Sequence, residues 1–193
     1  MEQVHTGLTQ NMVRLFIAVE IPSEVKQELT RLQEIVQKSN ILEGTYPKQE
    51  AMHLTLKFVG DLQIDRVAVI QEALRSIRYK NIAAQLSVLS LFGNPRMPKV
   101  IYVDVECPQL VDLVGELDSC LKDCCKPEER EFKSHLTVVR VRKTLDSDGI
   151  LKMLGQTDVK HLVFTVDHFN LMQSKLNSDG PMHTVIERYN LIP

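Results

Sequence analysis

Apolar residues along this chain follow two different spacings, and the spacing identifies the elements. Runs rich in β-branched and aromatic residues, broken by Gly, Pro, Asn and Asp, predict strands. Apolar residues three and four positions apart predict helices, because that spacing places them on one helical face. The predicted strands cover 13–21, 52–59, 84–92, 99–106, 134–142, 161–171 and 182–191. The predicted helices cover 23–38, 65–79, 109–123 and 147–155.

The predicted helices are apolar on one side only. The stripe after Pro22 consists of Val25, Leu29, Leu32, Ile35 and Val36. The stripe after Pro108 consists of Leu110, Leu113, Val114, Leu117 and Leu121, and a third stripe consists of Val67, Ile70, Leu74 and Ile77. A helix with a single apolar face buries it against another element, here a sheet. The interleaved helices and strands therefore predict an α+β protein.

An internal repeat divides the chain into two related halves. The strand-like run over 13–22 ends in Val-Glu-Ile-Pro, and the run over 100–108 ends in Val-Glu-Cys-Pro. Each run is followed by a helical stretch, and each half then reaches a strand that begins His-Leu-Thr, at 53–55 and at 135–137. The repeat predicts a bilobal fold, with duplicated sheet-and-helix halves related by a pseudo-two-fold axis around a central cleft. We expect residues 1–193 to form one domain of two intertwined lobes.

Composition and charge restrict the class of protein. The chain has 193 residues, of which 44% are hydrophobic and 25% are charged, as in ordinary soluble domains. The longest apolar run, 15–19, is far too short for a membrane span, and residues 1–11 lack the apolar core of a secretory leader. These features predict a cytoplasmic protein. The net charge of -2 does not favour binding to long duplexes through many phosphate contacts. Binding to a nucleic-acid end or to a small nucleotide is compatible with this charge.

The four cysteines do not predict a metal site. They fall close together, at Cys107, Cys120, Cys124 and Cys125. Cys120 and Cys124 have the spacing of a ligand pair, but no second Cys or His pair with zinc spacing accompanies them. We therefore expect reduced thiols, no bound metal and no cofactor.

The two His-Leu-Thr segments carry the candidate chemistry. Residues two apart on a strand project from the same face, so His53 points with Thr55, and His135 points with Thr137. Either pair alone is better explained by a capped sheet edge or by hydrogen bonds to neighbouring backbone groups. Two pairs at matching places of a repeat favour a shared active site, because the pseudo-two-fold axis brings both to one cleft.

This set of residues suits the cleavage of a phosphodiester. At neutral pH one imidazole can be neutral and activate water, while the other holds a proton and delivers it to the leaving oxygen. The hydroxyls of Thr55 and Thr137 can donate hydrogen bonds to the non-bridging phosphate oxygens and stabilise their charge. Nothing in this scheme requires a metal.

With these motifs, the chain resembles the two-histidine phosphoesterase superfamily and, within it, the LigT-like (ThpR) RNA 2',3'-cyclic phosphodiesterases. The segments that carry the resemblance are 14–19, 53–60, 92–95, 135–140, 174–176 and 180–181. The resemblance implies hydrolysis of a 2',3'-cyclic phosphate, on an RNA end or a nucleoside, to the 2'-phosphate. It also implies that His53 is the acid and His135 the base, although the sequence argument permits the reverse.

The resemblance further implies that Phe58 and Arg140 hold the terminal base. Both lie five residues after their motif histidine, so regular alternation would turn them away from it, and we expect a β-bulge or a strand end in each case. A core position is an equal alternative for Phe58. Val139 stands where many relatives have Gly, which puts the substrate range in doubt.

Other charged residues and histidines are set apart from this site. Lys57, Arg142 and Lys143 either add positive charge near RNA or belong to the solvated surface. The histidines without the motif, which are His5, His161, His168 and His183, are expected to do no chemistry.

Two further functions stay open at the level of sequence. One is a nucleotide-binding module that does not turn over, and the other is the joining of RNA ends through a 2'-5' linkage. We expect a monomer that binds no membrane.

Overall fold

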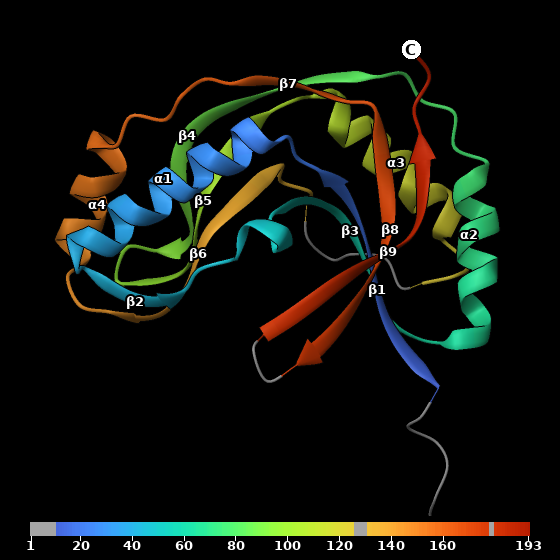
Figure 1. Ribbon diagram of the computed structural model, residues 1–193, viewed down its shortest axis with the longest axis horizontal. Helices are drawn as coiled ribbons and strands as arrows, with labels where there is room; N and C mark the ends of the chain where they lie inside the picture. The colour runs from blue at the N-terminus through green and yellow to red at the C-terminus, as the bar shows by residue number, and fades with distance from the viewer. Residues whose placement is uncertain (1–10, 126–130, 178–179) are drawn as a thin grey trace, which may run out of the picture.

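The computed structural model describes residues 11–125, 131–177 and 180–193, and it shows nine strands and four α-helices in this part of the chain (Figure 1). The strands are β1 (Met12–Glu20), β2 (Leu42–Thr45), β3 (His53–Gln63), β4 (Ile82–Asn94), β5 (Met97–Glu106), β6 (His135–Thr144), β7 (Val163–Val166), β8 (His168–Asn177) and β9 (Gly180–Asn190). The helices are α1 (Ser23–Ser39), α2 (Val67–Arg75), α3 (Gln109–Leu121) and α4 (Ser147–Gln156), with short 3₁₀ turns η1 (Gln49–Ala51) and η2 (Ile64–Arg66).

The strands form two antiparallel sheets with matching topology. The first sheet has the order β3-β1-β8-β9, and the second has the order β2-β6-β5-β4-β7. Without the edge strand β2, the second order repeats the first when β1 is matched with β5 and β3 with β6. The α+β class and the duplicated halves predicted from the sequence are therefore confirmed.

The first helix of each half packs against the sheet of the other half. Although α1 follows β1 of the first sheet, it contacts β6 and β2 of the second. Conversely, α3 follows β5 of the second sheet and contacts β3 of the first, beside α2. In Figure 1, α1 and α4 lie together over the second sheet, whereas α2 and α3 lie together at the first. The two halves are thus interleaved around one apolar core cluster to which both sheets contribute.

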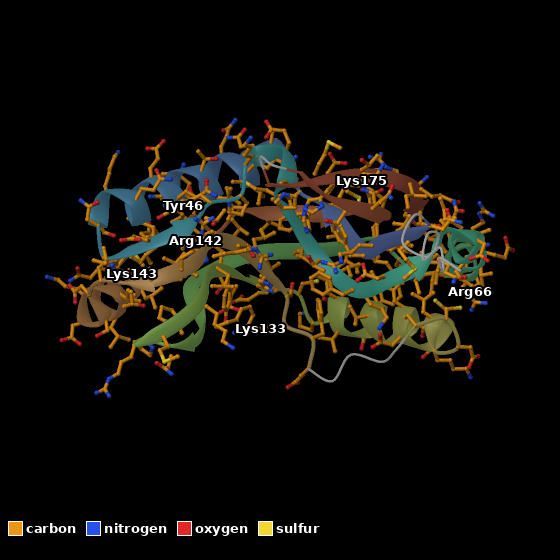
Figure 2. The ribbon with its side chains drawn as sticks, turned by 90° about the horizontal axis from the view of Figure 1, so that it is seen from below. Tyr46, Arg66, Lys133, Arg142, Lys143 and Lys175 are labelled. Carbon is orange, nitrogen blue, oxygen red and sulfur yellow. The ribbon has the colours of Figure 1, made fainter. Side chains whose placement is uncertain are left out.

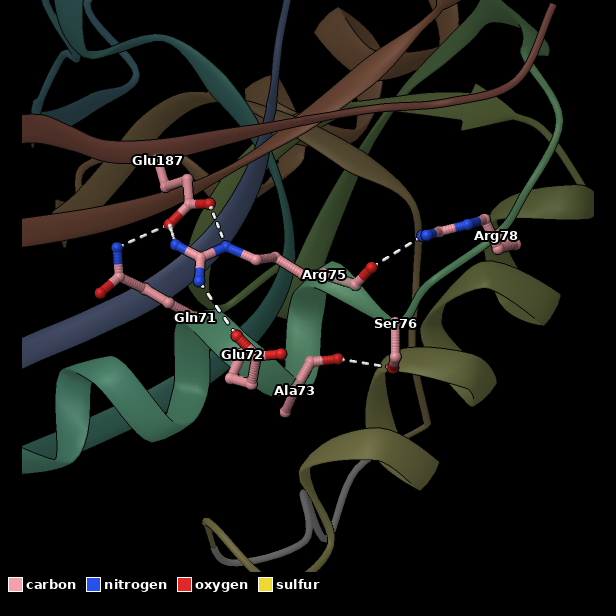
Figure 3. A network of polar contacts seen from close by, with 7 residues as sticks. All are labelled: Gln71, Glu72, Ala73, Arg75, Ser76, Arg78 and Glu187. Carbon is pink, nitrogen blue, oxygen red and sulfur yellow. Dashed lines mark hydrogen bonds and ion pairs between the residues drawn. The ribbon is translucent and has the colours of Figure 1, made fainter.

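Polar contacts hold α2 against the outer strand of the first sheet (Figure 3). The Arg75 guanidinium donates two hydrogen bonds to the Glu187 carboxylate on β9, from Nε at 2.8 Å and from Nη2 at 3.0 Å. The Gln71 amide donates a third to the same carboxylate at 2.6 Å. The register of β9 is therefore tied to a helix as well as to β8.

The strand predicted over 161–171 is wrong, because the structure divides this stretch between the two sheets. β7 pairs with β4 of the second sheet, and β8 pairs with β1 of the first. The chain changes sheets at Asp167, whose carbonyl oxygen accepts a hydrogen bond from the Leu191 amide. The apolar pattern runs through the crossing because both strands bury apolar side chains, so it does not mark the change of partner.

Two other elements differ from the prediction. β2 is too short and too polar for a periodic signal, and it forms by pairing with β6. This pairing requires glycine, since a Cβ atom at Gly44 would lie 2.4 Å from the Val139 side chain and 2.7 Å from the Arg140 carbonyl oxygen. The helix predicted over 65–79 begins instead as the 3₁₀ turn η2 and continues as α2 only to Arg75.

Candidate active site

The two His-Leu-Thr segments open the strands β3 and β6 and have the same local structure. In each strand the histidine and threonine are half-buried, while the leucine between them is fully buried. His53 therefore projects with Thr55, and His135 with Thr137, as strand alternation predicts. The strands β3 and β6 also contact one another where the two sheets meet.

A β-bulge follows the threonine in both strands. The register between β1 and β3 skips Leu56, and the register between β5 and β6 skips Val138. Each bulge leaves two consecutive buried residues, Leu56 with Lys57 and Val138 with Val139. One extra residue reverses the alternation, so the fifth residue after each histidine returns to the histidine's face. The bulges that the sequence argument required are thus present.

The bulges bring Phe58 and Arg140 to the faces that carry the histidines. Phe58 is 57% exposed, which excludes the alternative of a core aromatic. Its ring centroid lies 6.4 Å from that of Phe16, and Phe16 in turn lies 5.0 Å from the ring of His53. Arg140 is exposed on β6 and lies close enough to His53 and His135 to lower the pKa of both.

The bulge turns Lys57 away from this face, which contradicts both roles considered for it. Its side chain is only 2% exposed, so it is neither solvated surface nor available to RNA. Instead, Nζ donates a hydrogen bond to the Asp118 carboxylate on α3 at 2.5 Å. The buried charge thereby links β3 to the helix of the other half.

The His53 ring lies in an aromatic wedge on the first sheet. Its centroid lies 5.0 Å from that of Phe16 on β1 and 5.2 Å from that of His183 on β9, whose plane is at 88° to that of His53. The rings of Phe16 and His183 are themselves 5.0 Å apart, so the three rings form one cluster. Burial, together with the neighbouring His183, lowers the pKa of His53 to about 4, while a hydrogen bond with the backbone of Ala51 opposes the shift. His53 is therefore neutral at pH 7 in the free protein.

The His135 ring occupies the matching wedge on the second sheet. Its centroid lies 4.8 Å from that of Phe92 and 5.3 Å from that of Tyr102. Nδ1 is 2.7 Å from the Lys133 carbonyl oxygen, so this nitrogen carries the hydrogen and leaves Nε2 for chemistry. Burial lowers the pKa of His135 as well, against the effect of this hydrogen bond.

The two wedges share one electrostatic environment. His135 contributes to the lowered pKa of His53, and Arg140 contributes to the lowered pKa of His53, His135 and His183, in each case after burial as the main cause. A guanidinium close to three uncharged imidazoles makes this region suited to an anion.

His183 is the site residue that the sequence did not indicate. It has no threonine two positions later, and it comes to His53 only because β9 pairs with β8, which pairs with β1. Its pKa is lowered, first by burial and then by Arg140. Within the described residues, its Nδ1 is buried and has no hydrogen-bond partner. A pattern of adjacent residues cannot reveal such a contact.

A pocket of about 140 Å³ opens beside His53 on the same face of the first sheet. Its floor includes Ala18 and Met172, and its polar wall consists of Glu20, Lys26, Glu50, Asn170 and His183. The pocket extends from His53 across β1 and β8 to β9 and is bordered by α1 and η1.

The remaining candidate residues lie elsewhere. His161 contacts the Leu86 carbonyl oxygen and His168 contacts the Asp167 carboxylate, while His5 lies outside the described residues. Arg142 and Lys143 are exposed near the β2 end of the second sheet, beside Tyr46 in Figure 2, and Lys143 pairs with Glu43 at 3.7 Å.

Within the described residues, none of the four cysteines forms a disulfide, and no three His, Cys, Asp or Glu residues gather as metal ligands. None of the described helices is both long and apolar enough to cross a membrane.

Two matching sheets, each presenting a His-Thr pair on a bulged strand, define a two-histidine phosphoesterase. The family model described as LigT like Phosphoesterase matches residues 19–102. An RNA 2',3'-cyclic phosphodiesterase of Methanocaldococcus jannaschii is 30% identical over 179 residues, covering 92% of this chain and 100% of that protein. One of Methanothermobacter thermautotrophicus is 29% identical over 183 residues, covering 93% and 99%.

A crystal structure of a Thermus thermophilus protein has the same fold. Its TM-score is 0.75 at 24% identity, and the match covers 92% of this chain and 97% of that one. The chain belongs to the LigT-like family of two-histidine phosphoesterases.

Proposed function

We propose that this protein hydrolyses the terminal 2',3'-cyclic phosphate of RNA, or of a nucleoside, to the 2'-phosphate without a metal ion. The observation that carries the proposal is the repeated row on β3 and β6. In each row a histidine and a threonine share one face, and a bulge returns the fifth residue to that face. The curated relatives named as RNA 2',3'-cyclic phosphodiesterases support the choice of substrate.

The proposed reaction uses one imidazole on each side of phosphorus. A neutral imidazole takes a proton from water, and the water oxygen forms a bond to phosphorus. The bond between phosphorus and the 3' oxygen breaks, and an imidazolium gives its proton to that oxygen. The product is a 2'-phosphomonoester. At the end of the reaction the base holds the proton taken from water, and the acid has given its proton to the 3' oxygen.

We propose His53 as the base and His135 as the acid, which exchanges the roles that the resemblance implies. A base must be uncharged before the reaction, and burial together with His183 disfavours a charge on His53. An acid must hold a proton. The pKa of His135 is also lowered, but Asp104 opposes this shift. A bound phosphate anion raises the pKa of both imidazoles, and with His53 as the base, His135 is the imidazole left to act as the acid.

Thr55, Thr137, Arg140 and Phe58 have supporting roles in this proposal. The two hydroxyls donate hydrogen bonds to the non-bridging oxygens, and Arg140 adds positive charge as the negative charge on these oxygens grows. The exposed Phe58 ring offers a stacking surface to the terminal base. Stacking of one base on an aromatic side chain contributes about 1–3 kcal/mol of binding free energy.

The direct test incubates the protein, with chelator present, with a short RNA that ends in a 2',3'-cyclic phosphate. We expect a 2'-phosphate product. Binding without turnover would instead identify a nucleotide-binding module, and a 3'-phosphate would show that the other bond breaks. A parallel reaction with an added 5'-hydroxyl RNA detects joining through a 2'-5' linkage, and turnover that disappears with chelator would contradict the metal-free mechanism.

A modified leaving group assigns the acid. When sulfur replaces the bridging 3' oxygen, the leaving thiolate needs no proton, so loss of the acid becomes harmless. We expect this substrate to restore turnover to the His135→Ala variant and not to the His53→Ala variant. The reverse pattern would return the acid role to His53.

A further inference from the structure

The pocket beside His53 contains polar atoms that the fold leaves without partners. Asn170 on β8 is only 2% exposed, yet within the described chain its Oδ1 has no hydrogen-bond partner. His183 Nδ1, on the same wall, is equally buried and unpartnered. A buried polar atom without a partner destabilises a fold unless something else satisfies it. Two such atoms on one pocket wall indicate a ligand that provides their partners.

The sheet register places Asn170 on the face that carries the catalytic residues. Asn170 lies opposite Ala18 on β1, and Ala18 lies opposite Thr55 on β3. Cross-strand partners project from the same face of a sheet. Asn170, Thr55 and His53 therefore share one face, and a substrate with its phosphorus at His53 can extend into the pocket.

The size and lining of the pocket fit one planar six-membered ring. Its volume is about 140 Å³. For comparison, an apolar cavity of about 150 Å³ in another protein takes up benzene. Met172 and Val185 provide apolar contact for a ring, and Asn170, Lys26 and Glu50 provide hydrogen-bond acceptors and donors for its edge. A pyrimidine base has both the size and the polar edge, whereas a purine has a second fused ring.

We propose that this pocket is a recognition site for a pyrimidine base of the substrate, and that Asn170 reads the edge of that base. The proposal rests on the proposed hydrolysis of cyclic phosphates. The base belongs either to the terminal nucleotide or to the one before it. Phe58 lies further along β3 than Thr55, whereas the pocket extends from His53 in the direction of β8 and β9. If the terminal base stacks on Phe58, the pocket is therefore left for the base of the preceding nucleotide.

The test compares two series of substrates. The first contains the four nucleoside 2',3'-cyclic phosphates, and the second contains dinucleotides with a constant terminal adenosine cyclic phosphate and each of the four bases before it. We expect kcat/KM to favour pyrimidines by about tenfold in one series, as expected when a pocket excludes a larger group. The first series would assign the pocket to the terminal base and the second to the preceding base. Equal rates for all four bases in both series would overturn the proposal.

Asn170→Leu separates recognition from a structural role. Loss of one hydrogen bond to the base should reduce the pyrimidine preference about fivefold. Because leucine has the same branched shape and no unpaired polar atom, the melting temperature should stay equal or rise. Asn190→Leu, at an exposed position of β9 outside the pocket, is the matched control and should keep the preference. An unchanged preference in Asn170→Leu, or its loss together with a lower melting temperature, would contradict the proposal.

Calorimetry keeps this test independent of turnover. The four nucleoside 2'-monophosphates and the matching dinucleotide 2'-phosphates should bind with the same preference for pyrimidines, weakened by Asn170→Leu. A protein that binds pyrimidines selectively but cleaves none of the substrates would contradict the proposed hydrolysis alone. A protein that cleaves and binds all four bases equally would contradict the pocket alone.

Discussion

His53 combines burial with the role of general base proposed for it. Phe16 and His183 both pack against its ring. The same contacts remove water that would stabilise an imidazolium, so the folded protein disfavours a charge on this residue. A general base must be uncharged before it accepts a proton, and an imidazole with a lowered pKa meets this condition at neutral pH.

The lowered pKa of His53 makes the folded protein less stable in acid. Its pKa is about 4 in the folded state, against an ordinary value of about 6.5 in the unfolded chain. Between these two values the unfolded chain binds the extra proton, so the free energy of unfolding falls as the pH is lowered from 6.5 to 4. The expected loss from this residue is about 3 kcal/mol.

Urea unfolding at pH 7 and at pH 4 measures this effect. His53→Phe keeps an aromatic ring and removes the titrating group, so the difference between the two pH values should shrink by about 3 kcal/mol in this variant. His161→Phe, which removes a histidine away from the site, is the control and should retain the wild-type difference. An identical pH dependence in wild type and His53→Phe would show that His53 titrates normally.

Removal of either motif histidine should abolish turnover. General acid or base catalysis contributes typically about 10²–10⁴-fold, so His53→Ala and His135→Ala should each lose at least the lower figure in kcat. Both side chains are only half-buried, and circular dichroism should show an unchanged fold. A wild-type rate in either variant would refute the acid-base scheme.

Sequence reasoning reached the His-Thr pairs, Phe58 and Arg140, but it could not reach His183 or Asn170. The first group stands at fixed offsets within one strand, where alternation and the bulge determine direction. His183 and Asn170 enter the site through the order β3-β1-β8-β9, which brings together strands far apart in the chain. A neighbour relation of that kind depends on strand pairing and leaves no local pattern.

At the scale of elements, the bulge in β6 depends on a helix from the other half. The carbonyl oxygen of Val138, the extra residue of the bulge, accepts a hydrogen bond from the Gln33 amide on α1 at 3.1 Å. The same Nε2 donates to the Pro47 carbonyl oxygen at 3.0 Å. Gln33 is buried, so no water can replace it easily. This helix therefore supports the local geometry that directs Arg140.

Gln33→Leu should weaken both the fold and the site. The buried carbonyl oxygen of Val138 would lose its partner, which costs about 1–3 kcal/mol, and the part-buried carbonyl oxygen of Pro47 would lose its bond as well. A less constrained bulge should also raise KM through a misplaced Arg140. Chemical denaturation and steady-state kinetics measure the two effects. Gln37→Leu, at an exposed position of the same helix, should change neither, and an unaltered Gln33→Leu protein would refute the role of the helix.

Apolar spacing located the helices well and the strand borders less well. The stripe on α3 is buried as predicted, and so is the stripe on α1 except for the partly buried Ile35, because each helix meets a single sheet. The continuous run over 161–171 proved to be two strands, since burial on either sheet produces the same apolar signal. Element type is local information, whereas the identity of the pairing partner belongs to the whole fold.

At the scale of the whole molecule, exchange of α1 and α3 couples the two sheets. Neither half covers its own sheet with its first helix, and the apolar core is contiguous between them. The buried Lys57, which bonds Asp118 of α3, adds a polar link between the halves. Loss of one sheet would therefore expose the helix that packs on it.

The two sheets should unfold in one cooperative transition. Hydrogen exchange of amides in β8 reports on the first sheet, and exchange of amides in β4 reports on the second. With increasing denaturant, both sets should show the same midpoint and the same slope. Two separate midpoints would show that the lobes are independent domains.

Because the first helix of each half packs on the sheet of the other half, the chain resembles a domain-swapped dimer whose two subunits are joined into one chain. A break between α2 and β4 would produce two fragments that are complementary and individually incomplete, so they should reassemble when mixed. The same complementarity allows two intact molecules to exchange their halves at high concentration. Such an exchange would give a symmetric swapped dimer in which both copies of the candidate site are restored.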